Sequence, residues 1–218
     1  MQTDKKLHLG CGQKYLQGYI NIDYPPAEHT VQNTSVADEY HDIRSLRYAS
    51  GTISEVRLHH VFEHFERFNA CAYMASWNSW LKLGGTIHIE VPDFETTMKK
   101  NLGTFSKGKF EGVALRHIFG SQEAGWAVHY EGYSADKLKQ LATLFGFGDC
   151  KIVRNDYKRT YNVEIIAKKV KNLTEQQCHQ AARSYLSSYM VDDSDTEQRM
   201  LEVWLEKYKE QIARSFAK

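Results

Sequence analysis

Short alternating apolar segments are separated by longer amphipathic segments along most of the chain. Alternation, or a short apolar run bounded by Gly or Pro, predicts strands over 6–9, 19–23, 36–40, 53–59, 86–91, 151–155 and 163–168. Apolar residues at helical spacing predict helices over 66–83, 110–119 and 135–145, with Gly84-Gly85 ending the first. This alternation indicates an α/β fold: a mainly parallel sheet with helices on both faces. The last two strands form a hairpin, which adds an antiparallel edge strand.

The pattern changes after Leu173. Two capping boxes, Thr174-x-x-Gln177 and Ser194-x-x-Glu197, predict a C-terminal helical pair over about 174–190 and 195–216. The second helix has an apolar face made of Leu201, Trp204, Leu205, Tyr208, Ile212 and Phe216. We expect this face to pack on the main domain; the alternative is a surface for a homodimer or another partner. The chain therefore divides into a main domain, 1–170, and a helical extension, 171–218.

Composition narrows the class of protein. The 218 residues carry 42% hydrophobic and 25% charged residues and a net charge of +1, which fits one globular α/β domain with an appendage rather than a general nucleic-acid binder. The four cysteines form no CxxC pair, so a zinc knuckle is not expected. No apolar run approaches the ~20 residues that span a bilayer. Residues 1–6 do not resemble a secretory signal, so we expect a cytoplasmic protein without membrane contact.

The first strand ends in a glycine turn, Leu7-His8-Leu9-Gly10-Cys11-Gly12. Such a turn lets the backbone approach a ligand closely at the carboxyl edge of a parallel sheet. Asp23, at the end of the next strand, can accept hydrogen bonds from both hydroxyls of a ribose. The third glycine of a dinucleotide site is replaced by Tyr15, and no GK[ST] sequence follows. An adenosine cofactor without phosphates, such as S-adenosylmethionine, therefore fits best.

Five segments in order resemble the successive motifs of class I S-adenosylmethionine-dependent methyltransferases. They are Leu7–Gly12, Ile20–Asp23, Asp42–Leu46, His60–His64 and Leu81–Pro92. The closest variety is the small predicted methyltransferases linked with bacterial or phage surface-sugar gene sets, and the resemblance covers about residues 5–168. It implies a Rossmann-like fold and methyl transfer to a small-molecule or carbohydrate acceptor.

The resemblance also implies which residues contact the cofactor. Gly10, Cys11 and Gly12 would line its methionine part, Asp23 would hold the ribose, Asp42 and Ile43 would lie beside the adenine, and His59 and His60 would face the sulfonium. One departure is the segment 13–18, which is too short for the usual first helix of this family.

Residues 94–133 form an insertion that commonly covers the substrate in this fold. Its candidate acceptor contacts are Arg116, His117, Trp126, Tyr130 and Tyr133. The alternative, of equal weight, is that these aromatic side chains only pack the insertion onto the sheet. His129 is the best candidate for a general base, and Asp93, after Pro92, is the second.

The sequence His60-Val61-Phe62-Glu63-His64 also matches a zinc-protease pattern, HxxEH. That chemistry needs these residues on a helix, whereas here they follow a strand end. Some methyltransferases hold a divalent metal with Glu-x-x-Glu-His at this place, but His60 in place of the first Glu disfavours magnesium. We therefore expect Glu63 and His64 to brace the following helix, and no metal.

The predicted function is S-adenosylmethionine-dependent O- or N-methylation, in which the protein aligns the acceptor with an activated methyl group. A non-catalytic S-adenosylmethionine-binding or assembly protein is the alternative. The missing third glycine argues against a nicotinamide oxidoreductase. A nucleic-acid methyltransferase would normally carry Asn/Asp-Pro-Pro-Tyr after the fourth strand, where this chain has His59-His60-Val61-Phe62.

Overall fold

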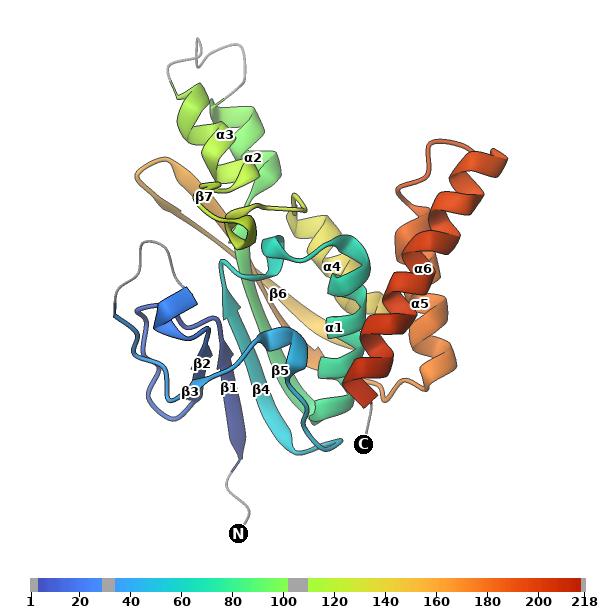
Figure 1. The fold of residues 1–218 in the computed structure, drawn as a ribbon, viewed down its shortest axis with the longest axis horizontal. Helices are drawn as coiled ribbons and strands as arrows, with labels where there is room; N and C mark the ends of the chain where they lie inside the picture. The colour runs from blue at the N-terminus through green and yellow to red at the C-terminus, as the bar shows by residue number, and fades with distance from the viewer. Residues whose placement is uncertain (1–3, 29–33, 102–109, 217–218) are drawn as a thin grey trace.

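The computed structural model describes residues 4–28, 34–101 and 110–216, and it contains one seven-stranded sheet (Figure 1). The strand order is β3-β2-β1-β4-β5-β7-β6. The strands are β1 (Lys5–Leu9), β2 (Ile20–Asp23), β3 (Glu39–Tyr40), β4 (Ile53–His59), β5 (Leu81–Pro92), β6 (Phe147–Tyr157) and β7 (Thr160–Lys169). All neighbours pair in parallel except β7, which is antiparallel to both β5 and β6. The predicted Rossmann-like class with an antiparallel edge hairpin is confirmed.

Six α-helices accompany the sheet in the described residues. They are α1 (Arg67–Trp80), α2 (Phe94–Asn101), α3 (Glu111–Phe119), α4 (Ala135–Leu144), α5 (Glu175–Ser187) and α6 (Asp195–Phe216). Five of the six were predicted to within a few residues; α2 was not. The capping box of Thr174 and Gln177 at the start of α5 is confirmed. At α6, Ser194 accepts from the Glu197 N–H, whereas the Glu197 carboxylate accepts from Val191 instead of Ser194.

The predicted end of the first helix at Gly84-Gly85 is wrong. The helix α1 ends at Trp80, and Leu81 already has the extended backbone that begins β5. Gly84 adopts a φ of 79° inside this strand, where the pairing with β4 shifts register. The two glycines therefore allow a strand irregularity, a place where Gly occurs as it does at helix ends.

One face of the sheet forms the hydrophobic core. Every second residue of the central strands is an apolar side chain with at most 1% exposure, namely Leu7, Leu9, Val56, Leu58, Ile87, Ile89, Val163 and Ile165. Helices α1, α4, α5 and α6 gather on one side of the sheet (Figure 1). Helix α6 packs against α1 and α5, as expected, and Leu201, Leu205, Tyr208 and Ile212 of its apolar face are buried, Leu205 fully. Trp204 is partly buried, and the side chain of Phe216 lies outside the part that the structure describes.

The alternate positions of the same strands carry polar and charged side chains. Arg57 pairs with Glu164 at 3.4 Å, and His88 lies 3.3 Å from both Glu55 and Glu164. Helical cover is thus unequal between the faces. The physical reason is that, in the described residues, the crossovers on either side of β2 contain no α-helix, only the 3₁₀ turn Pro26–Glu28.

Two consequences follow for the position of a site. The carboxyl ends of β1, β2 and β4 lie at one edge of the sheet, since these strands pair in parallel. Helices α2 and α3 stand beyond the end of β5, beside the tip of the β6–β7 hairpin (Figure 1).

Among the described residues, no helix has both the length and the apolar character needed to cross a bilayer.

The packing of α6 on α1 can be tested with Leu205→Ala. Because Leu205 is fully buried, we expect this truncation to lower the free energy of unfolding by about 2–5 kcal/mol, measured by urea denaturation. The matched control is Val203→Ala, also on α6 but 49% exposed, which should change stability by less than about 0.5 kcal/mol. Equal effects of the two substitutions would show that α6 does not pack as described.

Candidate active site

The glycine turn after β1 is tied to the end of β2 by backbone hydrogen bonds. The N–H groups of Gly10 and Cys11 both donate to the Ile22 carbonyl, at 2.8 and 3.1 Å. Gly10 and Gly12 have φ angles of 67° and 54°, which favour glycine. A Cβ atom at Gly10 would lie only 2.3 Å from Cγ2 of Val61. The turn therefore requires glycine at position 10 for two separate reasons.

The carboxylate of Asp23 is held by the same turn. Its Oδ2 accepts from the Gly12 N–H at 2.5 Å and its Oδ1 from the Tyr24 N–H at 2.7 Å. Cys11 is buried, with Sγ 3.8 Å from Asp23 Oδ2, and burial together with Asp23 raises the pKa of its thiol to about 12. Cys11 thus remains a thiol that packs behind the turn.

A second carboxylate stands after β3. Asp42 begins the 3₁₀ turn Ile43–Ser45 by accepting from the Arg44 N–H at 2.9 Å. It also accepts from Arg44 Nε at 2.8 Å, and the Arg44 guanidinium donates to the Tyr24 hydroxyl at 2.8 Å. This network orients Asp42. Burial alone would raise the pKa of the Asp42 carboxyl, but the hydrogen bonds from Arg44 lower it below its usual value.

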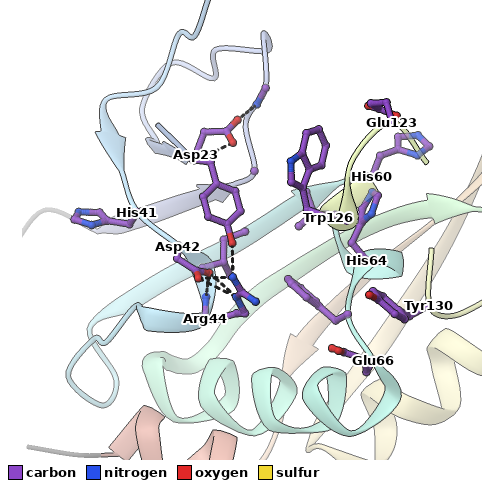
Figure 2. A pocket seen from close by; sticks show the side chains of 17 residues that line it. Asp23, His41, Asp42, Arg44, His60, His64, Glu66, Glu123, Trp126 and Tyr130 are labelled. Atoms are coloured by element: carbon purple, nitrogen blue, oxygen red, sulfur yellow. Dashed lines mark hydrogen bonds and ion pairs between the residues drawn. The ribbon is translucent and has the colours of Figure 1, made fainter. Parts of the chain in front are cut away.

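These groups line one cavity of about 580 Å³, within the usual size range of small-molecule sites. In Figure 2, Asp23, Asp42 and Arg44 lie on one side of it, and His60, His64, Trp126 and Tyr130 lie on the other. Six of the eight predicted cofactor residues line the cavity: Gly10, Gly12, Asp23, Asp42, Ile43 and His60. Cys11 and His59 do not.

His59 lies instead among the charged side chains of the open sheet face. Its Nε2 accepts from Arg57 Nε at 2.7 Å, and its Nδ1 is 3.8 Å from Glu90 Oε1. The next residue, His60, has a φ of 54°, a conformation that costs a residue other than glycine on the order of 1–3 kcal/mol. That strained backbone turns the His60 side chain toward the cavity while His59 keeps the direction set by the strand.

His60 lies between two carboxylates. Its Nδ1 is 3.3 Å from Glu63 Oε1, and its Nε2 is 3.5 Å from Glu90 Oε1. Burial alone would lower the pKa of this imidazole, but Glu63 and Glu90 together raise it to about 10. His60 is therefore a cation at neutral pH, at the wall of the cavity.

A second cavity of about 280 Å³ adjoins the first, since His64 and Trp126 line both. The predicted acceptor residues Arg116, His117 and Trp126 line this second cavity, as does His129. Tyr130 lines only the first. Tyr133 lies apart from both: it is fully buried in the core and stacks near Phe62, with ring centroids 5.2 Å apart.

The two candidates for a general base have different surroundings. His129 is mostly buried, with Nδ1 3.1 Å from the His117 carbonyl and Nε2 3.9 Å from Glu63 Oε1, and burial lowers its pKa. Asp93 is 1% exposed and caps α2, accepting from Thr96 N–H and hydroxyl groups at 3.0 and 2.7 Å. Asp93 lines neither cavity.

Comparison with known proteins addresses the fold. No protein-family model matches the sequence, and no curated protein matches it either. The structure is similar to an S-adenosylmethionine-dependent methyltransferase from Archaeoglobus fulgidus, with a TM-score of 0.52 and 16% identity over 77% of this chain and 87% of that chain. It is also similar to a chain of the complex between the Haloferax volcanii Trm112 methyltransferase activator and a methyltransferase, with a TM-score of 0.52 and 12% identity over 80% and 85% of the two chains. The fold is that of S-adenosylmethionine-dependent methyltransferases.

Several residues that line the first cavity were not predicted from the sequence. They are Tyr24, His41, Arg44, Val61, His64, Phe65, Glu66, Glu123 and Gly125. Tyr24 and Arg44 each lie within two positions of a predicted carboxylate, so adjacency to Asp23 and Asp42 was a usable signal. Glu123 and Gly125 come from the insertion, whose path over the cavity has no periodic signal.

The requirement for glycine at position 10 can be separated from ordinary backbone strain. Gly51 has a similar φ of 69° but open space around its Cα, whereas a Cβ at Gly10 would meet Val61. We expect Gly51→Ala to cost about 1–2 kcal/mol of unfolding free energy, and Gly10→Ala to cost about 1–3 kcal/mol more. Denaturation of both variants measures the difference. Equal losses would contradict the close packing of Val61 against the turn.

Proposed function

We propose that the protein is an S-adenosylmethionine-dependent methyltransferase that acts on a small or sugar-type acceptor. The observation that carries the proposal is the cavity at the ends of β1, β2 and β4, where a glycine turn and two oriented carboxylates, Asp23 and Asp42, meet. Neither cavity needs to accommodate a phosphate for this ligand, which agrees with the absence of a phosphate-binding sequence.

The chemistry of the cavity fits S-adenosylmethionine. Asp23 would accept from the ribose hydroxyls, and Asp42 and Ile43 would lie beside the adenine. Gly10 and Gly12 leave room for the methionine part because they present backbone alone. The apolar side chains of Val61 and Phe65 complete the lining. The cofactor would supply a methyl group bound to a sulfonium. This methyl group is already activated for transfer, so the protein does not have to activate it.

The acceptor would occupy the second cavity. Arg116, His117 and Trp126 offer it a cation, an imidazole and an aromatic face, groups that suit a hydroxylated or anionic small molecule. The protein's main task is then to align the acceptor's oxygen or nitrogen with the methyl group. We assign the removal of a proton from a hydroxyl acceptor to the cluster around His129, at the boundary between the cavities. We do not propose a homodimer through α6, because Leu201, Leu205, Tyr208 and Ile212 of its apolar face are buried within the chain.

Calorimetry with S-adenosylhomocysteine tests the cofactor assignment. We expect the protein to bind it, and Asp23→Ala to weaken binding about 10- to 100-fold, since a hydrogen bond to a charged group contributes about 1.5–3 kcal/mol. The control is Asp136→Ala, an exposed carboxylate in the first turn of α4. Unchanged affinity in Asp23→Ala would refute the assignment of this cavity. Binding by the wild type without turnover on any sugar or small-molecule acceptor would instead favour a non-catalytic S-adenosylmethionine-binding protein.

A further inference from the structure

We propose that Glu63, His64 and His129 form a binding site for one divalent transition-metal ion at the boundary between the two cavities. One ligand atom from each of the three side chains lies within 4.8 Å of the other two. The site joins the 3₁₀ turn Phe62–His64 to His129, which lies 65 positions after His64 in the chain. The sequence suggests a metal at His60, Glu63 and His64 only as the less favoured alternative to bracing the next helix, and it does not group His129 with them.

The first supporting observation is the state of Glu63. Its side chain is 1% exposed, and neither carboxylate oxygen has a hydrogen-bond partner of regular geometry among the described residues. A buried carboxylate without such partners is costly unless a cation compensates it. His60 supplies an ion pair at 3.3 Å to one oxygen only. A metal ion would satisfy the remaining coordination of the carboxylate.

The second observation is the orientation of the two imidazoles. Nδ1 of His64 is 3.0 Å from the Val128 carbonyl, and Nδ1 of His129 is 3.1 Å from the His117 carbonyl. A carbonyl only accepts, so each Nδ1 donates its proton, and the lone pair of the neutral imidazole is then on Nε2, the nitrogen that would bind a metal. The Nε2 of His129 faces Glu63 Oε1 at 3.9 Å. Fixing the ring through one nitrogen while the other binds is the usual arrangement of metal-binding histidines.

The backbone supports the same arrangement. The Tyr130 N–H donates to the Glu63 carbonyl at 2.8 Å, and the His129 N–H donates to the Phe119 carbonyl at 3.2 Å. The loop that carries His129 is therefore attached both to the turn of Glu63 and His64 and to the end of α3. The two histidine rings lie edge to face, with centroids 4.7 Å apart.

The ligand set indicates the class of metal. Two imidazoles and one carboxylate suit zinc and similar first-row ions, whereas magnesium prefers oxygen ligands. Ligand bonds of about 2.0–2.2 Å require the three atoms to approach one another slightly from their present spacing. Three protein ligands leave at least one position open, as in catalytic zinc sites.

The open position would face an acceptor oxygen, because His64 lines both cavities and His129 lines the second. That use of the metal, to bind a hydroxyl-bearing acceptor beside the cofactor, rests on the proposed function. With the metal bound, the Nε2 of His129 is a ligand and does not act as the general base. The metal site itself does not, since it depends only on the three side chains and their hydrogen bonds.

The test is metal binding by tag-free protein stripped with a chelator. Zn²⁺ titrated by calorimetry, and Co²⁺ followed by its visible absorption, should each bind with a stoichiometry of one. Glu63→Gln and His129→Ala should each weaken Zn²⁺ binding by about 100-fold or more, because loss of outer-shell partners alone costs about 10- to 100-fold. His179→Ala, a partly exposed histidine on α5, is the matched control and should bind as the wild type does.

Circular dichroism checks that each variant is folded, and Glu63→Gln keeps the side-chain shape in case His129→Ala does not fold. Failure of the wild type to bind one equivalent, or equal affinity in Glu63→Gln and wild type, would overturn the metal site. S-adenosylhomocysteine binding is measured separately on the same samples. Cofactor binding without metal binding overturns this inference alone, and metal binding without cofactor binding overturns the proposed function alone.

Discussion

The hydrogen bonds between the turn after β1 and the end of β2 are the constraint on which the site depends. Gly10 and Cys11 share the Ile22 carbonyl, and Gly12 donates to the Asp23 carboxylate. In the described residues no α-helix lies between these two strands, so the turn cannot be held by helix packing. It is held by the neighbouring strand instead, and the same contacts fix the direction of Asp23. The rigidity of the cavity wall that carries Asp23 thus comes from backbone pairing.

The opposite wall of the cavity is built differently. Residues 60–64 and 125–130 are short segments that each contain a 3₁₀ turn, and the Tyr130 N–H joins them by donating to the Glu63 carbonyl. They carry His60, His64, Trp126 and Tyr130. Charges are concentrated there, around the buried carboxylate of Glu63. One wall therefore offers fixed hydrogen-bond acceptors, and the other offers imidazoles and aromatic surfaces. Such a division suits a site that must hold one ligand precisely and present a second one to it.

Much of the fold could be predicted from the sequence because its strands alternate so regularly. In β4, Val56 and Leu58 are buried while Arg57 and His59 are not, and this period of two identifies a strand directly. The error at Leu81–Gly85 arose because Gly occurs both at helix ends and at strand irregularities. The helix α2 escaped prediction because its residues are mostly polar and only Thr97 and Asn101 are buried.

The candidate site was predictable where it lies at strand ends and less so elsewhere. Asp23 ends β2, Gly10, Gly12 and Asp42 follow strands, and the structure brings all four to one cavity. His59 also ends a strand, but the alternation of side chains along β4 directs it to the polar face of the sheet. A prediction made only from its position at the strand end misses this direction. The grouping of Glu63 with His129 depends on the path of an irregular loop, and no local pattern in the sequence encodes it.

The charged face of the sheet has a consequence for how the strands find one another. His88 on β5 lies beside Glu55 on β4 and Glu164 on β7, and Arg57 on β4 reaches across β5 to the same Glu164. The neighbours of these residues in sequence fill the core. A slip of one residue would drive these ionic groups into the apolar layer and expose the aliphatic ones to water. A misaligned pairing therefore costs free energy twice, once for buried charges and once for exposed apolar side chains. The ion pairs thus favour the native register of the strands during folding.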